Sequence, residues 1–254
     1  MIRVVKIGGR PQSDPQLPAL VAQTLRRDAS KLVLVHGGGD EVTTLQSALG
    51  GSTTFVGGRR VTTEGDIDII RMALSGSANK RLVAKLVDRG VSAVGISGED
   101  AGLISAAALD FAQLGYVGSP REINVSFLSH LLTGGYVPVI SPVSRDAESK
   151  DGSALNVNGD DAAAAIAVAM KAQELVLVAD VEGVMSDGCV VSNLTIDGAR
   201  RLIENGTASK GMRAKVEAGI AAIHGGVARV RISDLSALID DSRGTCLSAI
   251  GELR

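Results

Sequence analysis

The sequence contains few aromatic residues and few cysteines. It has no tryptophan, two tyrosines and three phenylalanines in 254 residues, and no stretch reaches the ~18–20 consecutive apolar residues of a membrane-spanning helix. Its two cysteines, Cys189 and Cys246, lie far apart and have no neighbouring cluster of cysteine and histidine. This spacing argues against a zinc site and against a disulfide framework, so we expect packed or surface thiols.

Blocks of like charge are also absent. The 26 basic and 28 acidic residues are spread along the chain and give a net charge of −2. No segment therefore indicates binding to nucleic acid or to a membrane surface, and we expect a small-molecule partner. The N-terminus has no charged region followed by an apolar run and a cleavage site, so we expect a cytoplasmic protein.

Apolar runs alternate with helical patterns along the whole chain. The β-type runs predict core strands at 3–7, 31–36, 93–97, 137–141, 174–179 and 229–233. Apolar residues at helical spacing predict helices at 16–27, 39–48, 64–89, 124–134, 160–170, 195–205 and 212–224. This alternation is typical of parallel βαβ units, so we expect an α/β fold, a three-layer αβα sandwich with a largely parallel open central sheet.

Two segments interrupt the alternation. Residues 50–61 and roughly 103–118 predict hairpins that project from the sheet, where a hairpin would suit a substrate lid. The chain has no Pro/Ser-rich linker, tandem repeat or low-complexity tract. We therefore expect a single domain over residues 1–254, with a functional division near residues 142–154.

Short glycine-rich turns follow the first two predicted strands, at residues 8–9 and 37–39. Glycines there let backbone N–H groups approach an anion without a Cβ in the way, and a following helix adds its positive end. Lys6 ends the first strand, where burying an ammonium group is costly unless it finds an anion. The alternatives are a lysine that extends into solvent and a flexible connection at the second turn.

These turns match neither of two common nucleotide-binding motifs. The spacings of the Walker A motif and of the Gly-x-Gly-x-x-Gly dinucleotide fingerprint are absent. A P-loop protein and a Rossmann oxidoreductase are therefore disfavoured.

Two more charged residues occur beside glycine turns. Asp160 starts an alanine-rich helix, where an aspartate is often only an N-cap. Lys215 lies in the first turn of a later helix, where a lysine is electrostatically disfavoured unless an anion is near. Together with Lys6 they would form a set in which one carboxylate orients two ammonium groups, as electrostatic catalysis of phosphoryl transfer requires.

Seven short motifs follow one another along the chain: KIGG at 6–9, VHGGG at 35–39, GRRVT at 58–62, ANK at 78–80, NVNGD at 156–160, DVEGV at 180–184 and GMRAK at 211–215. In these motifs and their order the chain resembles the acetylglutamate kinases of the amino acid kinase family. The resemblance covers nearly all 254 residues. It implies the amino acid kinase fold and an enzyme, a phosphotransferase with a carboxyl group as acceptor.

The resemblance also implies a reaction and a set of residue roles. The reaction is ATP-dependent phosphorylation of the side-chain carboxylate of N-acetyl-L-glutamate, giving N-acetyl-L-glutamyl 5-phosphate and ADP in arginine biosynthesis. By resemblance, Lys6 and Lys215 stabilise the transition state and Asp160 organises them. The implied phosphate-binding residues are Gly8, Gly9 and Gly38, and the implied substrate-binding residues are Gly38, Gly39, Arg60 and Asn156.

The nucleotide side is implied in the same way. Residues 1–150 would form an approximate lobe for the acylated amino acid and for dimerisation, and residues 151–254 a lobe for ATP. The implied nucleotide-binding residues are Asp180, Gly183, Val184, Ser209, Gly211 and Met212. The sequence has no dedicated carboxylate cage for a metal, so Mg²⁺ would be held mainly through the ATP phosphates.

The residue types agree with this chemistry. A carboxylate nucleophile is already ionised at pH 7, so catalysis consists of alignment and charge neutralisation, and no catalytic histidine is required. Arg60 can grip a carboxylate through a planar guanidinium group, and Asn156 can donate to and accept from an amide.

Two departures from the family pattern leave alternatives open. A second arginine, Arg59, precedes Arg60, and Gly159 stands where alanine is common. One alternative is a kinase for carrier-protein-linked aminoadipate or glutamate in lysine or arginine biosynthesis, for which Arg10, Arg59 and Arg60 would form a basic entrance. Another is a catalytically silent regulator that binds an amino acid, although the charged set at the three implied catalytic positions argues against it.

The oligomeric state is also inferred from the resemblance. Feedback-sensitive acetylglutamate kinases resemble one another in an additional N-terminal helix that joins dimers into a hexamer, whereas this sequence starts at its first predicted strand. We therefore expect an arginine-insensitive homodimer. The apolar helix at residues 67–86 would form either a dimer surface or core.

Overall fold

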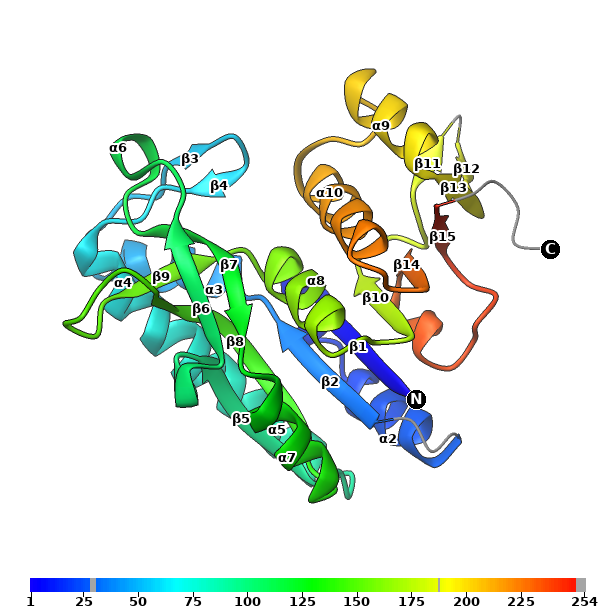
Figure 1. Cartoon of the computed structure of the whole chain (residues 1–254), viewed down its shortest axis with the longest axis horizontal. Coiled ribbons are helices and arrows are strands. Elements are labelled where there is room, and N and C mark those ends of the chain that lie inside the picture. Colours follow the sequence, from blue (N-terminus) through cyan, green and yellow to red (C-terminus); the bar gives the residue numbers. More distant parts are fainter. Residues whose placement is uncertain (28–30, 187, 250–254) are drawn as a thin grey trace.

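A largely parallel sheet runs through the centre of the molecule. The computed structural model describes residues 1–27, 31–186 and 188–249. Within these residues, eleven strands form one sheet in the order β13-β15-β14-β10-β1-β2-β8-β6-β7-β9, with β5 also paired to β8. Strand β1 lies between β2 and β10 and is parallel to both (Figure 1).

The strands of this sheet are β1 Ile2–Ile7, β2 Lys31–His36, β5 Ala93–Gly98, β6 Ile104–Ala108, β7 Val117–Ile123, β8 Val137–Asp146, β9 Ala154–Val157, β10 Glu174–Val178, β13 Asn193–Thr195, β14 Arg229–Ser233 and β15 Thr245–Ser248. Two separate hairpins are β3 Phe55–Val56 with β4 Arg59–Arg60, and β11 Met185–Ser186 with β12 Cys189–Val190. The α-helices are α1 Gly9–Gln12, α2 Leu17–Arg27, α3 Gly39–Ala48, α4 Glu64–Ile70, α5 Asn79–Val87, α6 Phe111–Leu114, α7 Val125–Thr133, α8 Gly159–Ala169, α9 Ile196–Glu204 and α10 Lys210–His224. The π-helix η1 spans Arg71–Ala78, and the 3₁₀ helices η2 and η3 span Asp100–Gly102 and Leu235–Leu238.

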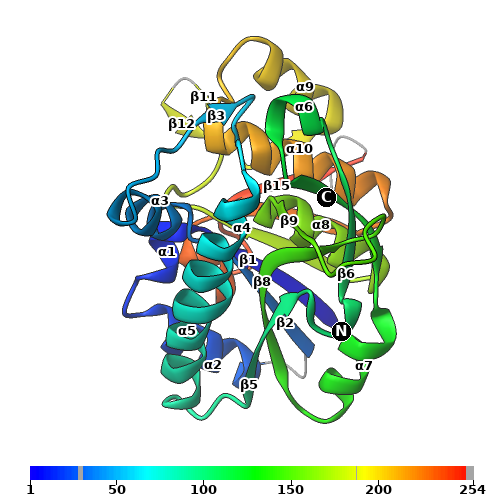
Figure 2. The ribbon, with the colours of Figure 1, turned by 90° about the vertical axis from the view of Figure 1, so that its left-hand side faces the viewer.

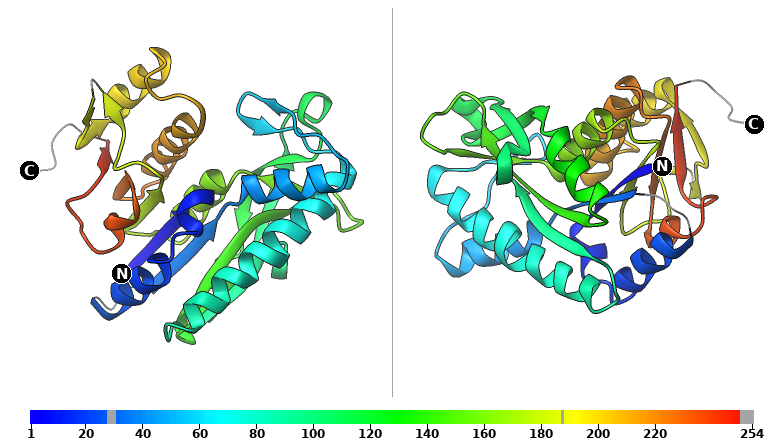
Figure 3. Two further views of the ribbon diagram at one scale, coloured as in Figure 1. Left: turned by 180° about the vertical axis from the view of Figure 1, so that it is seen from behind. Right: turned by 60° about the horizontal axis from the view of Figure 1, so that its bottom comes forward.

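Both faces of the sheet are buried under helices. Along β1, Val4 belongs to a core cluster with residues of α7, α8 and α10, whereas Val5 and Ile7 belong to a second cluster with residues of α2 and α5. Successive side chains of a strand point to opposite faces, so one apolar run supplies both clusters. Figure 3 shows α2 and α5 on the face opposite to the one that α7 and α8 cover in Figure 1. The predicted three-layer αβα sandwich with a largely parallel sheet is confirmed.

The six predicted core strands are all present, but the two predicted hairpins differ. Residues 50–61 contain the isolated hairpin β3–β4, as expected. The prediction that residues 103–118 project from the sheet was wrong. There β6 and β7 pair with each other, and they also pair with β8 and β9 of the main sheet. The apolar side chains of Ile104, Ala106 and Val117 are buried, which holds this pair in the sheet.

The predicted helix at 64–89 is present as three segments in line. A capping box at Thr63 starts α4, η1 continues it as a π-helix, and α5 completes it (Figure 2). The π-helical stretch lies against β8 and α3, and a π-turn within a long helix is frequent at functional sites. Ile67, Leu74 and Leu82 are buried within this chain, so the apolar stripe of this run belongs to the core.

Parallel strands bring their carboxyl ends to one edge of the sheet. Hairpin β3–β4 and helices α9 and α10 lie at this end, on opposite sides of β1 and α8 (Figure 1). In open α/β sheets ligands bind outside the carboxyl ends of the strands. In the part of the chain that the structure describes, no helix has the length and apolar character needed to cross a bilayer.

The opposite edge of the sheet contains a buried ion cluster. Glu174 on β10 lies 2.7 Å from Nε of Arg3 on β1 and 2.6 Å from Nε of Arg231 on β14. All three side chains are buried. The Glu174 carboxylate thus joins three adjacent strands, and the half-exposed Asp241 adds a second negative charge, 3.4 Å from NH2 of Arg3 and 3.5 Å from NH2 of Arg231.

We expect that Glu174→Ala destabilises the fold by about 3–5 kcal/mol, because it leaves two buried guanidinium groups with only the more distant, half-exposed carboxylate of Asp241. Urea denaturation followed by circular dichroism measures this change. Glu204→Ala on the exposed side of α9 is the control, and it should change stability by less than about 0.5 kcal/mol. A Glu174 variant as stable as the control would contradict a structural role for the cluster.

Candidate functional site

The two predicted glycine turns lie side by side at the carboxyl ends of β1 and β2. Gly8 is the N-cap of α1, and Gly38 is the N-cap of α3. Gly38 has φ +148°, and a Cβ there would lie 2.7 Å from Leu74. Only glycine fits this position, both for its backbone conformation and for the close approach of η1.

The structure brings Lys6, Asp160 and Lys215 together from β1, α8 and α10. Nζ of Lys6 lies 3.0 Å from Oδ1 of Asp160, and Nζ of Lys215 lies 3.2 Å from both carboxylate oxygens. All three side chains are buried. One carboxylate therefore faces two ammonium groups, and the set keeps a net charge of +1 beside the cavity described below.

The pKa values follow from this crowding. Burial alone would raise the pKa of Asp160, but the two ammonium groups outweigh it and hold that pKa below its ordinary value. Burial and repulsion from Lys6 lower the pKa of Lys215 to about 8, against the attraction of Asp160. At pH 7 the carboxylate is ionised and Lys215 is mostly protonated.

The surroundings of two of these residues differ from expectation. Asn158, not Asp160, is the N-cap of α8, because its side chain accepts from the N–H of Asp160. Helix α10 begins at Lys210, which places Lys215 in the second turn and not in the first. The positions of Asp160 and Lys215 are thus explained by their ion pair and not by helix ends.

A cavity of about 370 Å³ opens beside this charge set. Of the predicted site residues, those lining it are Lys6, Gly9, Gly38, Gly39, Arg60, Asn156 and Asp160. Gly8 and Lys215 are next to the cavity but are not part of its lining. Phe55, Leu74 and Val117 add apolar surface to the same cavity.

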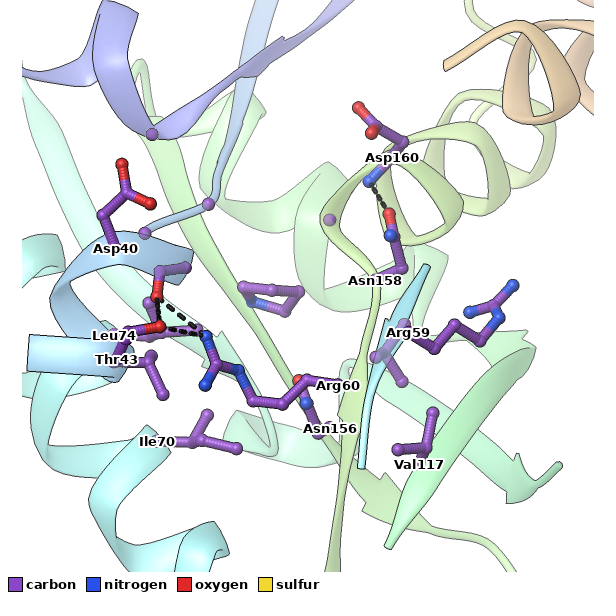
Figure 4. A pocket seen from close by; sticks show the side chains of 18 of the residues that line it. Asp40, Thr43, Arg59, Arg60, Ile70, Leu74, Val117, Asn156, Asn158 and Asp160 are labelled. Atoms are coloured by element: carbon purple, nitrogen blue, oxygen red, sulfur yellow. Dashed lines mark hydrogen bonds between the residues drawn. The ribbon is translucent and has the colours of Figure 1, made fainter. Parts of the chain in front are cut away.

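Arg60 lies at the other end of the cavity, away from Asp160 (Figure 4). Its NH1 donates to Oε1 of Gln46 at 3.0 Å and to Oγ1 of Thr53 at 2.9 Å. Its NH2 donates to the carbonyl oxygen of Gly39 at 2.9 Å and to Oγ1 of Thr43 at 2.8 Å. These four acceptors are neutral, so they orient the guanidinium group without balancing its charge.

Arg60 is therefore a buried cation, and in the described part of the chain no acid is among its direct contacts. Burial lowers its pKa, and the nearby Asp66 and Asp40 only partly offset this. The ring of Phe55 lies under the guanidinium group, 5.1 Å from ring centroid to Cζ. A desolvated positive charge at a cavity wall is suited to binding an anion.

Asn156 lies next to Arg60 in the cavity wall (Figure 4). Its Nδ2 donates to Oγ1 of Thr62 at 3.0 Å. This bond fixes the amide orientation and leaves Oδ1 as an acceptor toward the cavity side.

Arg59 points to the opposite side of the hairpin from Arg60 (Figure 4). Its NH2 donates to Oδ2 of Asp161 at 2.8 Å, so the hairpin is tied to the first turn of α8. Burial raises the pKa of Asp161, although the Arg59 guanidinium opposes this. Asp160 and Asp161 are adjacent, yet one holds the lysines and the other holds the hairpin.

Sequence reasoning missed several contacts of this site. Thr43, Gln46 and Thr53 orient Arg60, and Asp161 anchors Arg59. For the Arg59–Asp161 pair, the only local signal was the presence of two adjacent acidic residues at the start of α8. The contacts of Arg60 join α3 to the β3–β4 hairpin. The residues involved show no regular spacing in the sequence from which the contacts could have been predicted.

The six predicted nucleotide-binding residues do not line this cavity. Asp180 follows β10 and pairs with Arg10, with 2.9 Å between NH1 and Oδ2. Val184 is buried, and its N–H donates to Oγ1 of Thr245 at 2.7 Å. Ser209 is the N-cap of α10, and Gly211 and Met212 lie in the first turn of that helix. Gly183 directly precedes Val184. Their predicted role is not tested by this geometry.

The described residues include no group of three or more His, Cys, Asp or Glu side chains suited to a metal ion. Both cysteines are free; Cys189 is exposed and Cys246 is partly buried. Fixed cations and glycine backbone groups lie at the cavity, so the site is suited to an anionic ligand.

Comparison with known proteins gives consistent results. The model of the amino acid kinase family matches residues 1–234. Acetylglutamate kinase from Geobacillus sp. (strain WCH70) is 42% identical over 221 residues, which cover 87% of this chain and 85% of that protein. Acetylglutamate kinase from Chloroflexus aurantiacus is 42% identical over 241 residues, or 94% of each chain. The crystal structure of smu.665 from Streptococcus mutans UA159 superposes with a TM-score of 0.89 at 29% identity, covering 98% of this chain and 99% of that one.

We expect that Asp160→Asn destabilises the fold at pH 7 by about 3–5 kcal/mol, since two buried ammonium groups lose their anion. The deficit should shrink as pH rises toward about 8 and then level off, because wild-type Lys215 keeps its proton up to its pKa of about 8, whereas loss of the Asp160 attraction lowers the pKa of Lys215 further in the variant. Below about pH 8 the folded wild type therefore binds more protons than the folded variant, so the variant gains stability relative to the wild type as pH rises.

Urea denaturation at several pH values tests this. Asp161→Asn is the control, because its partner Arg59 does not titrate in this range and its deficit should stay constant. An Asp160→Asn deficit that is independent of pH would contradict the shared charge set.

Proposed function

The chain belongs to the amino acid kinase family, and we propose that it transfers the γ-phosphoryl group of ATP to the side-chain carboxylate of N-acetyl-L-glutamate. The products are N-acetyl-L-glutamyl 5-phosphate and ADP, and the step belongs to arginine biosynthesis. One observation carries the proposal. At one end of the cavity is a guanidinium group that contacts no acid among the described residues, and at the other is the Lys6 ammonium group, with Lys215 paired to the same Asp160 carboxylate next to the cavity, as an acidic acceptor and a phosphoryl donor require.

Arg60 and Asn156 account for recognition of the acceptor. The Arg60 guanidinium binds the α-carboxylate, and Oδ1 of Asn156 accepts from the amide N–H of the acylated amino group. Phe55, Leu74 and Val117 supply apolar surface for the acyl methyl group. The backbone N–H of Gly39 completes this end of the site.

The transfer itself requires positioning and charge neutralisation. An oxygen of the ionised side-chain carboxylate forms a bond to the γ-phosphorus while the bond to the β,γ-bridging oxygen breaks, and the electron pair leaves with ADP. Lys6 and Lys215 stabilise the charge on the transferring group, and Asp160 keeps them apart and oriented. The N–H groups of Gly8, Gly9 and Gly38 donate to the phosphoryl oxygens.

ATP is assigned to the other side of the charge set, in the lobe of residues 151–254. The residues proposed to contact the nucleotide are Asp180, Gly183, Val184, Ser209, Gly211 and Met212. Mg²⁺ would be held mainly through the ATP phosphate oxygens and would neutralise part of their charge.

The proposal extends to a homodimer in the cytoplasm, with residues 1–150 forming the lobe for the acylated amino acid and for dimerisation. Light scattering on the purified protein would test the dimer.

The two alternatives have less support. A carrier-protein substrate would use a basic entrance, but Arg10 pairs with Asp180, Arg59 pairs with Asp161 and Arg60 points into the cavity. A silent regulator would not need both Lys6 and Lys215 within 3.2 Å of the Asp160 carboxylate. Neither alternative explains both ends of the cavity.

Acyl phosphate formation, trapped with hydroxylamine, tests the function directly. We expect ATP-dependent turnover of N-acetyl-L-glutamate and little or none of unacylated glutamate, aspartate or N-acetyl-L-aminoadipate. Lys6→Met should lower kcat by about 10²–10³, because one of the two phosphoryl-stabilising charges is lost. A folded protein that binds ATP but turns over none of these free substrates would contradict the proposal.

Arg60→Ala should raise the KM for N-acetyl-L-glutamate by about 10–100-fold, because this change corresponds to the loss of one charge-assisted hydrogen bond. If Arg60 contacts the substrate equally before and during transfer, kcat changes little. Steady-state kinetics measure both constants. Arg121→Ala, at an exposed position on β7, is the control and should leave KM unchanged. An unchanged KM in the Arg60 variant would remove this residue from the substrate site.

A further inference from the structure

His36 is a buried titratable side chain that the proposed mechanism does not use. It ends β2 directly before the second glycine turn, is fully buried and does not line the cavity. Its Nδ1 lies 2.8 Å from the carbonyl oxygen of Gly37, and its Nε2 lies 3.0 Å from Nδ2 of Asn79. Both ring nitrogens therefore have one partner each.

The surroundings of Asn79 decide which ring nitrogen carries the proton. Its Nδ2 also lies 2.8 Å from the carbonyl oxygen of Val139, and its Oδ1 accepts from Nζ of Lys80 at 3.2 Å. The amide thus presents an N–H to His36, so Nε2 is the acceptor. The single proton is on Nδ1, which donates to the carbonyl of Gly37.

This network leaves no room for a second proton on the ring. Burial lowers the pKa of His36 to about 4, and Lys6 and Lys80 act in the same direction against Glu41. The network is also packed tightly. A Cβ at Gly95 would lie 2.1 Å from Oδ1 of Asn79, so glycine is required where β5 passes the amide.

The bond from His36 fixes the orientation of one peptide unit. The Gly37–Gly38 peptide is trans, so the C=O of Gly37 and the N–H of Gly38 point in opposite directions. The carbonyl points to the buried ring, and both glycines line the cavity. The N–H of Gly38 is therefore directed to the cavity side, and within the described residues it has no hydrogen-bond partner.

We propose that His36 is a positioning residue that locks the Gly37–Gly38 peptide so that the N–H of Gly38 faces the anion reacting in the cavity. The neutral ring acts as a fixed donor behind the turn and never exchanges protons with substrate. Asn79 fixes the orientation of the His36 ring, and the ring in turn fixes the orientation of the Gly37–Gly38 peptide. This inference rests on the proposed function, because the anion is the phosphoryl group in transfer or its acceptor.

Two substitutions separate positioning from packing. In His36→Asn the amide nitrogen takes the place of Nδ1 and can still donate to Gly37. In His36→Gln the amide reaches the place of Nε2, keeps the contact with Asn79 and loses the bond to Gly37. We expect kcat to fall by about 10²–10³ in the Gln variant, as when one preorganised donor is lost, and to be largely retained in the Asn variant.

The KM for N-acetyl-L-glutamate should change less than kcat in the Gln variant, and the thermal stabilities of the two variants should not parallel their activities. A merely structural role predicts that activity follows stability in both. Equal kcat in the two variants, or kcat that follows the unfolding temperature, would overturn the proposal.

A second measurement does not depend on turnover. In ¹⁵N-histidine spectra of the whole protein, the His36 signals, assigned by their loss in the Gln variant, should show a protonated Nδ1 and a bare Nε2 from about pH 5.5 to 8. Inorganic phosphate should shift the Gly38 amide resonance in the wild type and in the Asn variant, but not in the Gln variant. A protonated Nε2, or equal phosphate shifts in both variants, would refute the proposal even if the wild type phosphorylates no tested substrate.

Discussion

The shared carboxylate of Asp160 is the interaction on which the site depends. It holds two buried ammonium groups that come from a central strand and a distant helix. Without an anion between them, Lys6 and Lys215 would repel each other in a medium that screens charge poorly. Because the set is not neutral, its remaining positive charge favours a negatively charged ligand in the adjoining cavity.

The parallel sheet provides the frame for this interaction. Strand β1 is hydrogen-bonded on both sides, so the position of Lys6 is fixed by β2 and β10 together. The glycine turns then bring backbone donors to the same edge, where side chains would not fit. In this site the charges are contributed by side chains and the close contacts by the backbone.

The sequence predicted the parts of the molecule that have a local pattern. Long apolar runs such as 31–36 and 174–179 identified the central strands, and the helical periods identified seven helices within a few residues. Short strands such as β9 and β15 have too few residues for a period, and they form because neighbours pair with their backbone. The pairing of Lys6, Asp160 and Lys215 followed from charges beside glycine turns. The neutral acceptors around Arg60 could not be predicted in this way, because they come together only in the folded chain.

The two adjacent acids at the start of α8 constrain the length of the chain before them. Successive residues of a helix are rotated by about 100°, so Asp160 and Asp161 reach different partners, the lysines on one side and Arg59 on the other. A single-residue insertion or deletion in the turn between β9 and α8 would rotate both carboxylates together and misdirect both at once. The length of this turn is therefore constrained by two ion pairs at once.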